Sequence, residues 1–302
     1  MKTTNLANKE NRLPNFLVIG PPKCATSWLY TCLREHPDIY LPFIKEIHFF
    51  DLYYEKGLDW YKRYFNLWNE QKAAGEITPS YIYGGETARR IAKDLKDVRL
   101  IAVLRNPVDR AYSHYCHHIR KGMVTTDFET ALENNPKYVE QGFYFSHLEQ
   151  YFAVFPREKF LILIYDDIEN DARAFLRQIF RFLEVGEDFL PKFTYQKLPP
   201  ELLSAPVYNW VSQTSRFLRN KMGLGSLIDA IKKPAVLSYA DRVFDKFSYA
   251  GKNLKSGAVK ESPAMKLATR ERLLALFHKE NEKLAAFLGR DLSAWCSHAA
   301  KG

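Results

Sequence analysis

A short loop near the N-terminus combines the residue types that hold a phosphate-like anion. The segment Gly20-Pro-Pro-Lys-Cys-Ala-Thr-Ser-Trp28 follows an apolar run and leads into residues 26–35, whose apolar side chains recur at helical spacing. The free N–H groups at the start of a helix attract an anion. Lys23 adds a full positive charge, and Thr26 and Ser27 add hydroxyl donors. We therefore predict that this strand–loop–helix unit binds an anion, with Lys23 as its central charge.

A second candidate anchor follows another buried strand. The apolar run 98–104 ends in Arg105, and Ser113 lies in the predicted helix that begins at Pro107. In a parallel sheet the strand ends gather at one edge, where ligands bind. A guanidinium with a hydroxyl suits an isolated phosphate, so the two anchors together suit a nucleotide with phosphate groups at both ends of its ribose. An alternative is that Arg105 only pairs with Asp109.

Other interpretations of the loop remain open. The nucleoside-triphosphate signature GxxxxGK[ST] is absent, because Lys23 comes early and no Gly-Lys precedes Thr26. A P-loop kinase using ATP and magnesium remains an alternative, since a third predicted strand ends in Asp166-Asp167. A non-catalytic nucleotide- or polyanion-binding protein is another. The plainest alternative makes Lys23 a surface lysine and Thr26 a helix cap.

The two motifs resemble those of a known family. PKCATSW followed by RNPVDRAYSHY is similar to the cofactor motifs of the sulfotransferases that use 3′-phosphoadenosine-5′-phosphosulfate (PAPS), above all the heparan-sulfate-type branch and its bacterial relatives. The resemblance covers roughly residues 15–185 and 264–296. It implies that the first motif holds the 5′-phosphosulfate and the second the 3′-phosphate. The cofactor-binding residues expected on this basis are Lys23, Cys24, Ala25, Thr26, Ser27, Trp28, Arg105, Ser113 and Lys260.

Two further segments extend the resemblance. Lys45-Glu-Ile-His-Phe-Phe-Asp51 resembles the segment with the family's catalytic glutamate, which makes Glu46 the expected general base. We expect desolvation beside aromatic residues to raise its pKa. His48 is the competing base, because on a strand-like segment both side chains would point the same way. Residues 75–81 resemble a substrate-cleft segment. The remaining histidines of interest are expected to be structural or at the surface: His36, His114, His117 and His118.

The chain departs from the family pattern at two positions. Ala25 stands where glycine is usual, which is acceptable only if the backbone dihedrals there are ordinary. Ile77 stands where the heparan-sulfate branch often has lysine, so a polyanionic sugar acceptor is less expected. The adenine is expected to stack on Trp28 or on a residue of 252–260, near Lys260.

The order of elements predicts an α/β fold. Strands at 15–20, 98–104 and 160–165 alternate with helical patterns, which indicates a central parallel β-sheet flanked by helices, the P-loop-like sulfotransferase fold. We expect residues 1–14 to be a flexible lead and 15–302 to form a single domain with a mostly helical insertion or lid at 198–262. The predicted helices are 26–35, 84–95, 107–122, 126–134, 143–155, 171–183 and 264–288, the last with Leu267, Leu273, Leu274, Phe277, Leu284 and Phe287 on one face.

Composition narrows the possible partners. The net charge is +9, but Lys and Arg are scattered along the 302 residues, so no nucleic-acid tail is indicated. Four cysteines without a CxxC pair predict no zinc site and favour a reducing compartment. No apolar leader and no run of about 20 apolar residues is present, so we expect a cytoplasmic protein without a membrane partner.

The expected reaction moves a sulfonate group from PAPS to a hydroxyl or amine and releases 3′,5′-adenosine bisphosphate. No metal is expected, because lysine and backbone donors can supply the positive field. Aromatic residues gather in 53–68 and 198–250, which favours a small-molecule natural product or a short saccharide as the acceptor. The oligomeric state is left open.

Overall fold

The computed structural model describes residues 13–192 and 264–296. All of them belong to one of the two units into which the chain divides, which joins residues 1–196 to residues 262–302. The predicted insertion at 198–262, with Lys260, lies outside the described residues.

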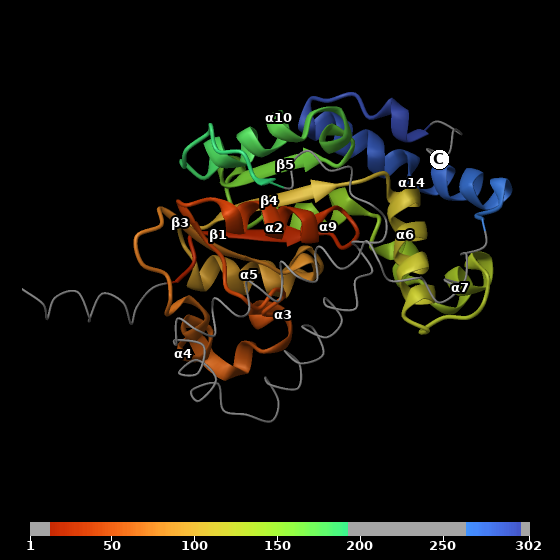
Figure 1. Cartoon of the computed structure of the whole chain (residues 1–302). Coiled ribbons are helices and arrows are strands. Elements are labelled where there is room, and N and C mark those ends of the chain that lie inside the picture. The colour runs from red at the N-terminus through yellow and green to blue at the C-terminus, as the bar shows by residue number, and fades with distance from the viewer. Residues whose placement is uncertain (1–12, 193–263, 297–302) are drawn as a thin grey trace, which may run out of the picture. The chain divides into compact units, whose positions relative to one another are not determined.

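A five-stranded parallel sheet organises this unit, with strand order β2-β3-β1-β4-β5 (Figure 1). The central strand is β1 (Phe16–Gly20), buried along its whole length. It pairs with β3 (Ala73–Ile77) on one side and β4 (Arg99–Leu104) on the other. The edges are β2 (Ile39–Tyr40) and β5 (Phe160–Ile164). Because all the strands are parallel, the carboxyl ends of β1, β3 and β4 lie at one edge of the sheet.

The three predicted strands are confirmed as β1, β4 and β5, but β2 and β3 were not predicted. Strand β3 reads AAGEI, a sequence of small residues and one glutamate that lacks the usual branched and aromatic side chains. Its position next to β1 explains this composition. A Cβ added at Gly75 would lie only 2.4 Å from the carbonyl oxygen of Phe16, so a larger residue cannot fit there.

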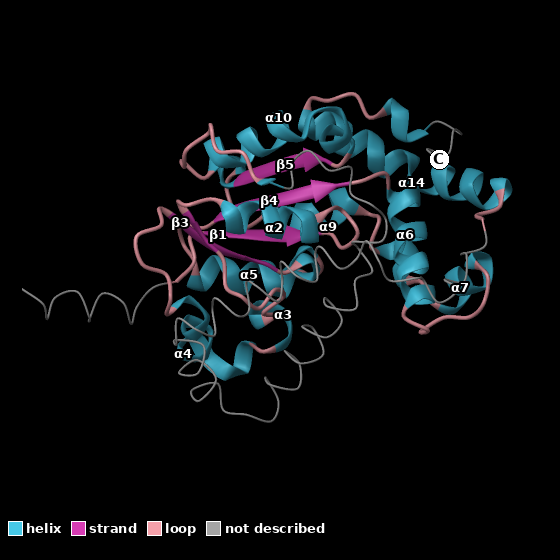
Figure 2. Ribbon diagram, in the orientation of Figure 1, coloured by secondary structure: helices cyan, strands magenta, loops and turns pink. Residues whose placement is uncertain are grey.

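Helices pack on both faces of the sheet (Figures 1 and 2). The predicted helices in the described residues are confirmed with small changes of bounds. The largest change is in the helix after β5, which begins at Asp166, although its backbone is non-helical at Asp171, where the predicted helix starts. The helices are α2 (Thr26–Glu35), α3 (Phe49–Leu52), α4 (Gly57–Lys62), α5 (Gly85–Asp94), α6 (Pro107–Arg120), α7 (Phe128–Asn134), α8 (Lys137–Glu140), α9 (Tyr144–Phe152), α10 (Asp166–Phe182) and α14 (Leu267–Leu288).

Helix α14 packs into a core formed by elements much earlier in the chain. Leu273, Leu274 and Phe277 are buried in a cluster with residues of α6, α7 and α8. The Arg270 guanidinium also pairs with Asp109 on α6 at 2.8 Å. The predicted apolar face is wrong at Leu267, which is 62% exposed because it opens the helix outside this cluster.

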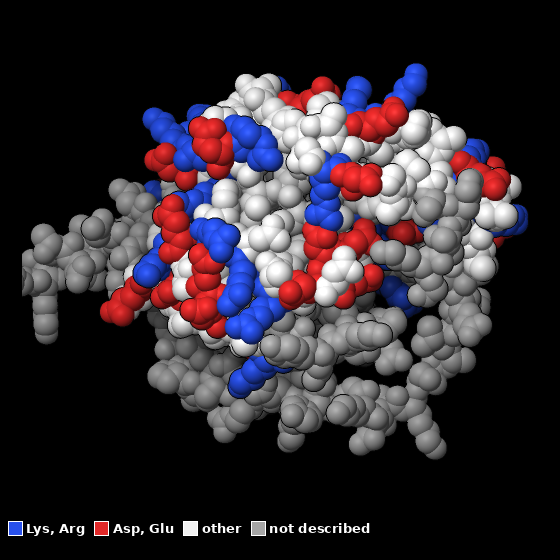
Figure 3. Space-filling view, turned by 90° about the horizontal axis from the view of Figure 1, so that it is seen from above, with Lys and Arg blue, Asp and Glu red and all other residues white. Residues whose placement is uncertain are grey.

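The surface shows no segregation of charge on the face drawn in Figure 3, where basic and acidic side chains are interleaved. Within residues 13–192 and 264–296, no helix is long and apolar enough to span a membrane.

Candidate active site

The loop after β1 is curled by two residues with left-handed backbone. Lys23 has φ 72° and Ala25 has φ 57°, and Ala25 caps α2 by accepting the Leu29 N–H at 2.9 Å. The first N–H groups of α2 have no partner within the helix, as at every helix start, so they are available to an anion. Ala25 therefore lacks the ordinary backbone dihedrals that were expected for an alanine in place of glycine. An alanine in this region costs about 1–2 kcal/mol.

Lys23 lies among other positive charges. Its pKa is lowered to about 8, chiefly by burial and then by the charges of Arg120, Arg105 and Lys121. Arg120 and Lys121 lie at the end of α6, and Arg105 lies at the end of β4. A site in which cations repel one another favours a ligand with several negative charges, because such a ligand removes the repulsion.

Arg105 lies close to the Lys23 loop. Its charge acts on Lys23, and its backbone acts on the neighbouring Cys24 thiol. The half-buried guanidinium lies over the Tyr165 ring at 4.7 Å from the centroid. The alternative pairing with Asp109 is not seen, because that carboxylate binds Arg270 instead. The structure thus brings the two predicted anchors to one edge of the sheet.

The other predicted cofactor residues differ in what they can offer. Ser113 is half-buried on α6, and its phosphate contact stays a prediction. Cys24 is fully buried, and burial raises the pKa of its thiol to about 12, which leaves its backbone as the group for a ligand. Thr26 is 6% exposed and Ser27 half-buried at the start of α2.

Trp28 lies in the core. Its ring is 5% exposed and packs 6.0 Å from the Phe175 ring on α10. This burial argues against the expected stacking of adenine on Trp28. The other predicted candidates, residues 252–260 with Lys260, lie outside the described residues.

The predicted base belongs to a cluster of five polar side chains. His48 Nε2 lies 3.7 Å from Glu46 Oε2, and His48 Nδ1 lies 3.0 Å from Asp51 Oδ2. Ser80 Oγ donates to the same Asp51 oxygen at 2.6 Å. On the other side, Lys45 Nζ donates to Glu46 Oε1 at 2.7 Å. Asp51 and Ser80 were not predicted, although Asp51 follows His48 at the spacing that brings side chains together at the start of a helix.

The backbone explains how these side chains meet. The expected strand-like segment is wrong, because Glu46 (φ 63°) and His48 (φ 58°) both have left-handed backbone and His48 caps α3. The two side chains still approach each other, but through a loop that turns twice. Left-handed backbone at a residue other than glycine is uncommon and clusters at functional sites.

Neighbouring charges shift the pKa of Glu46 in the direction opposite to the one expected. Burial acts to raise the pKa of Glu46, but Lys45 and His48 outweigh it and hold that pKa well below its usual range. Burial would lower the pKa of His48, but Asp51 and Glu46 raise it to about 9. The prediction of a raised pKa at Glu46 is therefore wrong. At neutral pH the cluster contains an ionised Glu46 and a protonated His48.

Strand β3 joins the base cluster to the phosphate loop. Ile77 O accepts the Glu46 N–H at 3.2 Å, and Thr78 N donates to Val18 O of β1 at 3.1 Å. Beyond them, the Pro79 carbonyl packs on Gly20 so closely that an added Cβ would lie 1.9 Å from its oxygen. The base and the loop with Lys23 are thus held by adjacent strands.

The histidines expected to be structural fall into two groups. His36 is buried at 2% exposure, and its Nε2 lies 2.8 Å from Gly186 O, which confirms a structural role. His114 and His117 are half-buried on α6. Their pKa values are lowered to about 2 and about 3, chiefly by burial, with Lys23 among the further causes. His114 and His117 therefore lie near Lys23 as neutral rings, which was not predicted. His118, half-buried on the same helix, also has a lowered pKa, chiefly because of burial.

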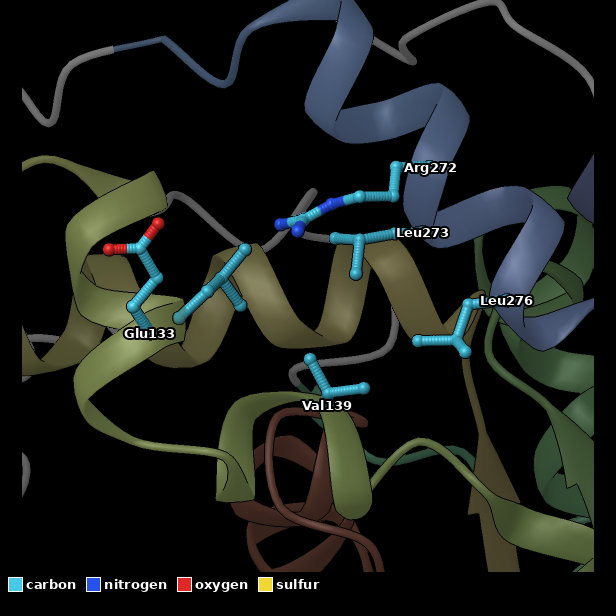
Figure 4. Close-up of a pocket in the computed structure, with 6 residues that line it drawn as sticks. Glu133, Val139, Arg272, Leu273 and Leu276 are labelled. Atoms are coloured by element: carbon cyan, nitrogen blue, oxygen red, sulfur yellow. The ribbon is translucent and has the colours of Figure 1, made fainter.

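A cavity of about 500 Å³ lies between α7, α8 and α14, away from these residues (Figure 4). None of the predicted site residues lines it. Its walls are Leu132, Glu133, Val139, Arg272, Leu273 and Leu276.

Known proteins are similar to this chain in sequence, and a solved structure is similar to it in fold. Residues 13–199 match the family model for the sulfotransferase domain. The membrane-associated sulfotransferase kil1 of Dictyostelium discoideum is 43% identical over 106 residues, 34% of this chain and 22% of that protein. Heparan sulfate glucosamine 3-O-sulfotransferase 3A1 of Mus musculus is 32% identical over 193 residues, 61% of this chain and 49% of that protein. The chain thus spans half or less of the length of these curated relatives.

A solved structure extends the likeness over nearly the whole chain. The crystal structure of a sulfotransferase from Alicyclobacillus acidocaldarius has a TM-score of 0.65 and 25% sequence identity, and the match covers 95% of this chain and 100% of that one. The parallel sheet with flanking helices is therefore the predicted fold, and the chain belongs to the sulfotransferase family.

Proposed function

We propose that this protein transfers a sulfonate group from PAPS to a hydroxyl or amine of an acceptor and releases 3′,5′-adenosine bisphosphate. The observation that carries the proposal is the meeting of Lys23 and Arg105 at one sheet edge, with Glu46 attached to the adjacent strand. The residues present fit a nucleotide with phosphates at both ends. The α2 N-terminus and Lys23 suit one phosphate, and Arg105 with Ser113 suits the other.

Each residue has a defined part in this proposal. Bound PAPS supplies the activated sulfur–oxygen bond, which breaks as the acceptor atom bonds to sulfur. Lys23, held in its protonated form by the anion, stabilises the negative charge on the leaving phosphate oxygen. Thr26, Ser27 and the backbone of the loop hold that phosphate in place. Glu46 takes the proton from the acceptor.

The electrostatics favour Glu46 over His48 as the base. A pKa of about 9 keeps His48 protonated at neutral pH, so its ring cannot accept a proton there. Glu46 is ionised over the same range. His48 would orient the Glu46 carboxylate, and Asp51 with Ser80 would orient His48.

The two carboxylates that a kinase would need to bind magnesium, Asp166 and Asp167, are engaged in other contacts. Asp167 is paired with Arg290 at 2.5 Å, and Asp166 accepts the indole N–H of Trp295 at 3.2 Å. Both carboxylates therefore hold the C-terminal segment in place, whereas a magnesium site would require them free.

For the acceptor we propose a small molecule or a short saccharide. Tyr53 and Trp60 form a half-buried aromatic pair, and the ammonium of Lys56 lies over both rings at 4.6 and 4.8 Å. The backbone N–H of Tyr53 also donates to His48 O at 3.0 Å, which places this pair next to the base cluster. Planar rings of this kind suit a flat ring or the face of a sugar. We further propose a cytoplasmic location, supported by four cysteines that are all free thiols.

One experiment tests the donor and the chemistry together. The protein should gain thermal stability with 3′,5′-adenosine bisphosphate but not with ATP and magnesium, and it should move label from PAPS to an acceptor in a screened set. Lys23→Ala should abolish transfer while the thermal unfolding without ligand stays close to wild type. Stabilisation by ATP and magnesium alone, or full activity of Lys23→Ala, would overturn the proposal.

A further inference from the structure

A buried carboxylate on β3, that of Glu76, lies outside the set of residues named in the proposed function. Glu76 is 2% exposed, although its neighbours along β3 are small or apolar. No Lys or Arg of the described chain pairs with it. A buried carboxylate without a cation is costly unless hydrogen bonds satisfy it, so a specific arrangement must hold it there.

Three hydroxyl groups satisfy this carboxylate. Tyr61 and Tyr81 donate to Glu76 Oε1 at 2.7 and 2.9 Å, and Thr78 donates to Oε2 at 2.7 Å. All three partners are themselves fully or nearly fully buried. Burial raises the pKa of Glu76, while these hydroxyls and the charge of His48 lower it in part. The charge of His48 thus acts on Glu76 although no hydrogen bond joins these two side chains.

The two tyrosines connect Glu76 to the segment that carries the base. The Tyr81 hydroxyl accepts the Phe50 N–H at 3.3 Å. The Tyr61 ring stacks on the Phe49 ring with centroids 4.5 Å apart and 11° between the planes. Phe49 and Phe50 form the first turn of α3, the helix that His48 caps and that contains Asp51.

From these contacts we infer that Glu76 is a positioning residue, which fixes α3 through Tyr61 and Tyr81 and so sets the geometry of the Glu46–His48–Asp51 cluster. The inference rests on the proposed function, because the cluster must contain the base. The left-handed backbone of Glu46 and His48 needs such support, since that conformation persists only where the surroundings fix it.

The hydrogen-bond geometry predicts a graded effect among variants. Tyr81→Phe deletes one hydroxyl and leaves the Phe50 N–H without its acceptor, so kcat should fall by on the order of 10² because the base is misplaced. The KM for PAPS and the affinity for 3′,5′-adenosine bisphosphate should stay unchanged, because the Lys23 loop is not touched. Glu76→Leu should lower kcat in the same way. Glu76→Gln keeps an oxygen for both tyrosines, and the Thr78 hydroxyl can rotate to accept, so its kcat should stay near wild type.

Tyr83→Phe is the matched control, because the Tyr83 hydroxyl lies outside this network and donates to Gln141 O at 3.5 Å. Its kcat should equal that of the wild type. If Glu76→Leu does not fold, Tyr81→Phe still decides the matter. Wild-type kcat in Tyr81→Phe, or a Glu76→Gln as slow as Tyr81→Phe, would overturn the inference. These outcomes are separate from failure of the proposed function, in which neither the bisphosphate nor PAPS would be recognised by any variant.

Discussion

A carboxylate between two cations is a weak base that is always ionised, and this is the environment of Glu46. Lys45 donates to one of its oxygens, and protonated His48 lies near the other. Such a group takes a proton only as the acceptor oxygen or nitrogen gives it up to the forming bond. The strength of the base is therefore less important than its position, which is how catalysis by positioning and electrostatics works in phosphoryl transfer as well.

At this scale, the first prediction concerns the base. Glu46→Gln should lower kcat by roughly 10²–10⁴-fold, the usual loss for a general base. The affinity for 3′,5′-adenosine bisphosphate should not change, because Glu46 belongs to the acceptor side. Steady-state kinetics and a binding titration on the same preparation measure the two quantities. Activity within a few-fold of wild type would remove Glu46 from the mechanism.

The second prediction concerns the charge of His48. Because its pKa is raised from 6.5 to about 9, its contribution to stability is complete below pH 6.5 and is lost as the pH rises through about 9. The difference in free energy of unfolding between wild type and His48→Gln should therefore shrink over this interval. Urea unfolding of both proteins across that pH range measures it.

Lys23, whose pKa is lowered to about 8, titrates in the same window with the opposite effect on stability. It is present in both proteins, so it cancels in the comparison. A difference that is constant with pH would mean that the pKa of His48 is the same in the folded and unfolded states.

At the scale of elements, the phosphate loop has backbone strain at Ala25, which is caused by its side-chain methyl group. Ala25→Gly removes that methyl from a residue with φ 57°. The relief of about 1–2 kcal/mol exceeds the entropy that glycine adds to the unfolded chain, so stability should rise by about 0.5–1 kcal/mol. Ala275→Gly, on the exposed side of α14, is the control and should lower stability by about 1 kcal/mol. Equal effects of the two changes would contradict the strain.

Several elements could be predicted from the sequence, and the reasons differ. Strands β1 and β4 are continuous apolar runs because both faces are covered. Strand β3 could not be predicted from the sequence, because most of its residues have low strand propensity. Their small size allows the close approach to β1, and Glu76 is held by hydrogen bonds from residues outside the strand. The sequence motifs also identified Lys23, Arg105 and Glu46. The left-handed backbone at Glu46 and His48 could not be predicted, because it depends on contacts with β3 and α3 that no local sequence pattern encodes.

For the whole molecule, α14 completes the core that begins far earlier in the chain. Phe277 is fully buried beside Phe143, with ring centroids 5.1 Å apart. Phe277→Ala should lower the free energy of unfolding by about 3–5 kcal/mol. The neighbouring Leu276 is 48% exposed, and Leu276→Ala should change stability by only about 0.5 kcal/mol. Denaturant unfolding of the two variants compares them directly, and similar losses would show that α14 does not contribute to this core.

The close packing of Pro79 on Gly20 affects how new acceptors can be introduced by protein engineering. A substitution that displaces the Pro79 backbone also displaces Gly20 at the start of the phosphate loop, so gains in substrate range from such variants would be offset by weaker PAPS binding. Variation at Tyr53, Lys56 and Trp60 avoids this trade-off, since these residues pack on one another beside the base cluster, on α4 and the segment that precedes it. Directed evolution of acceptor specificity should therefore begin there.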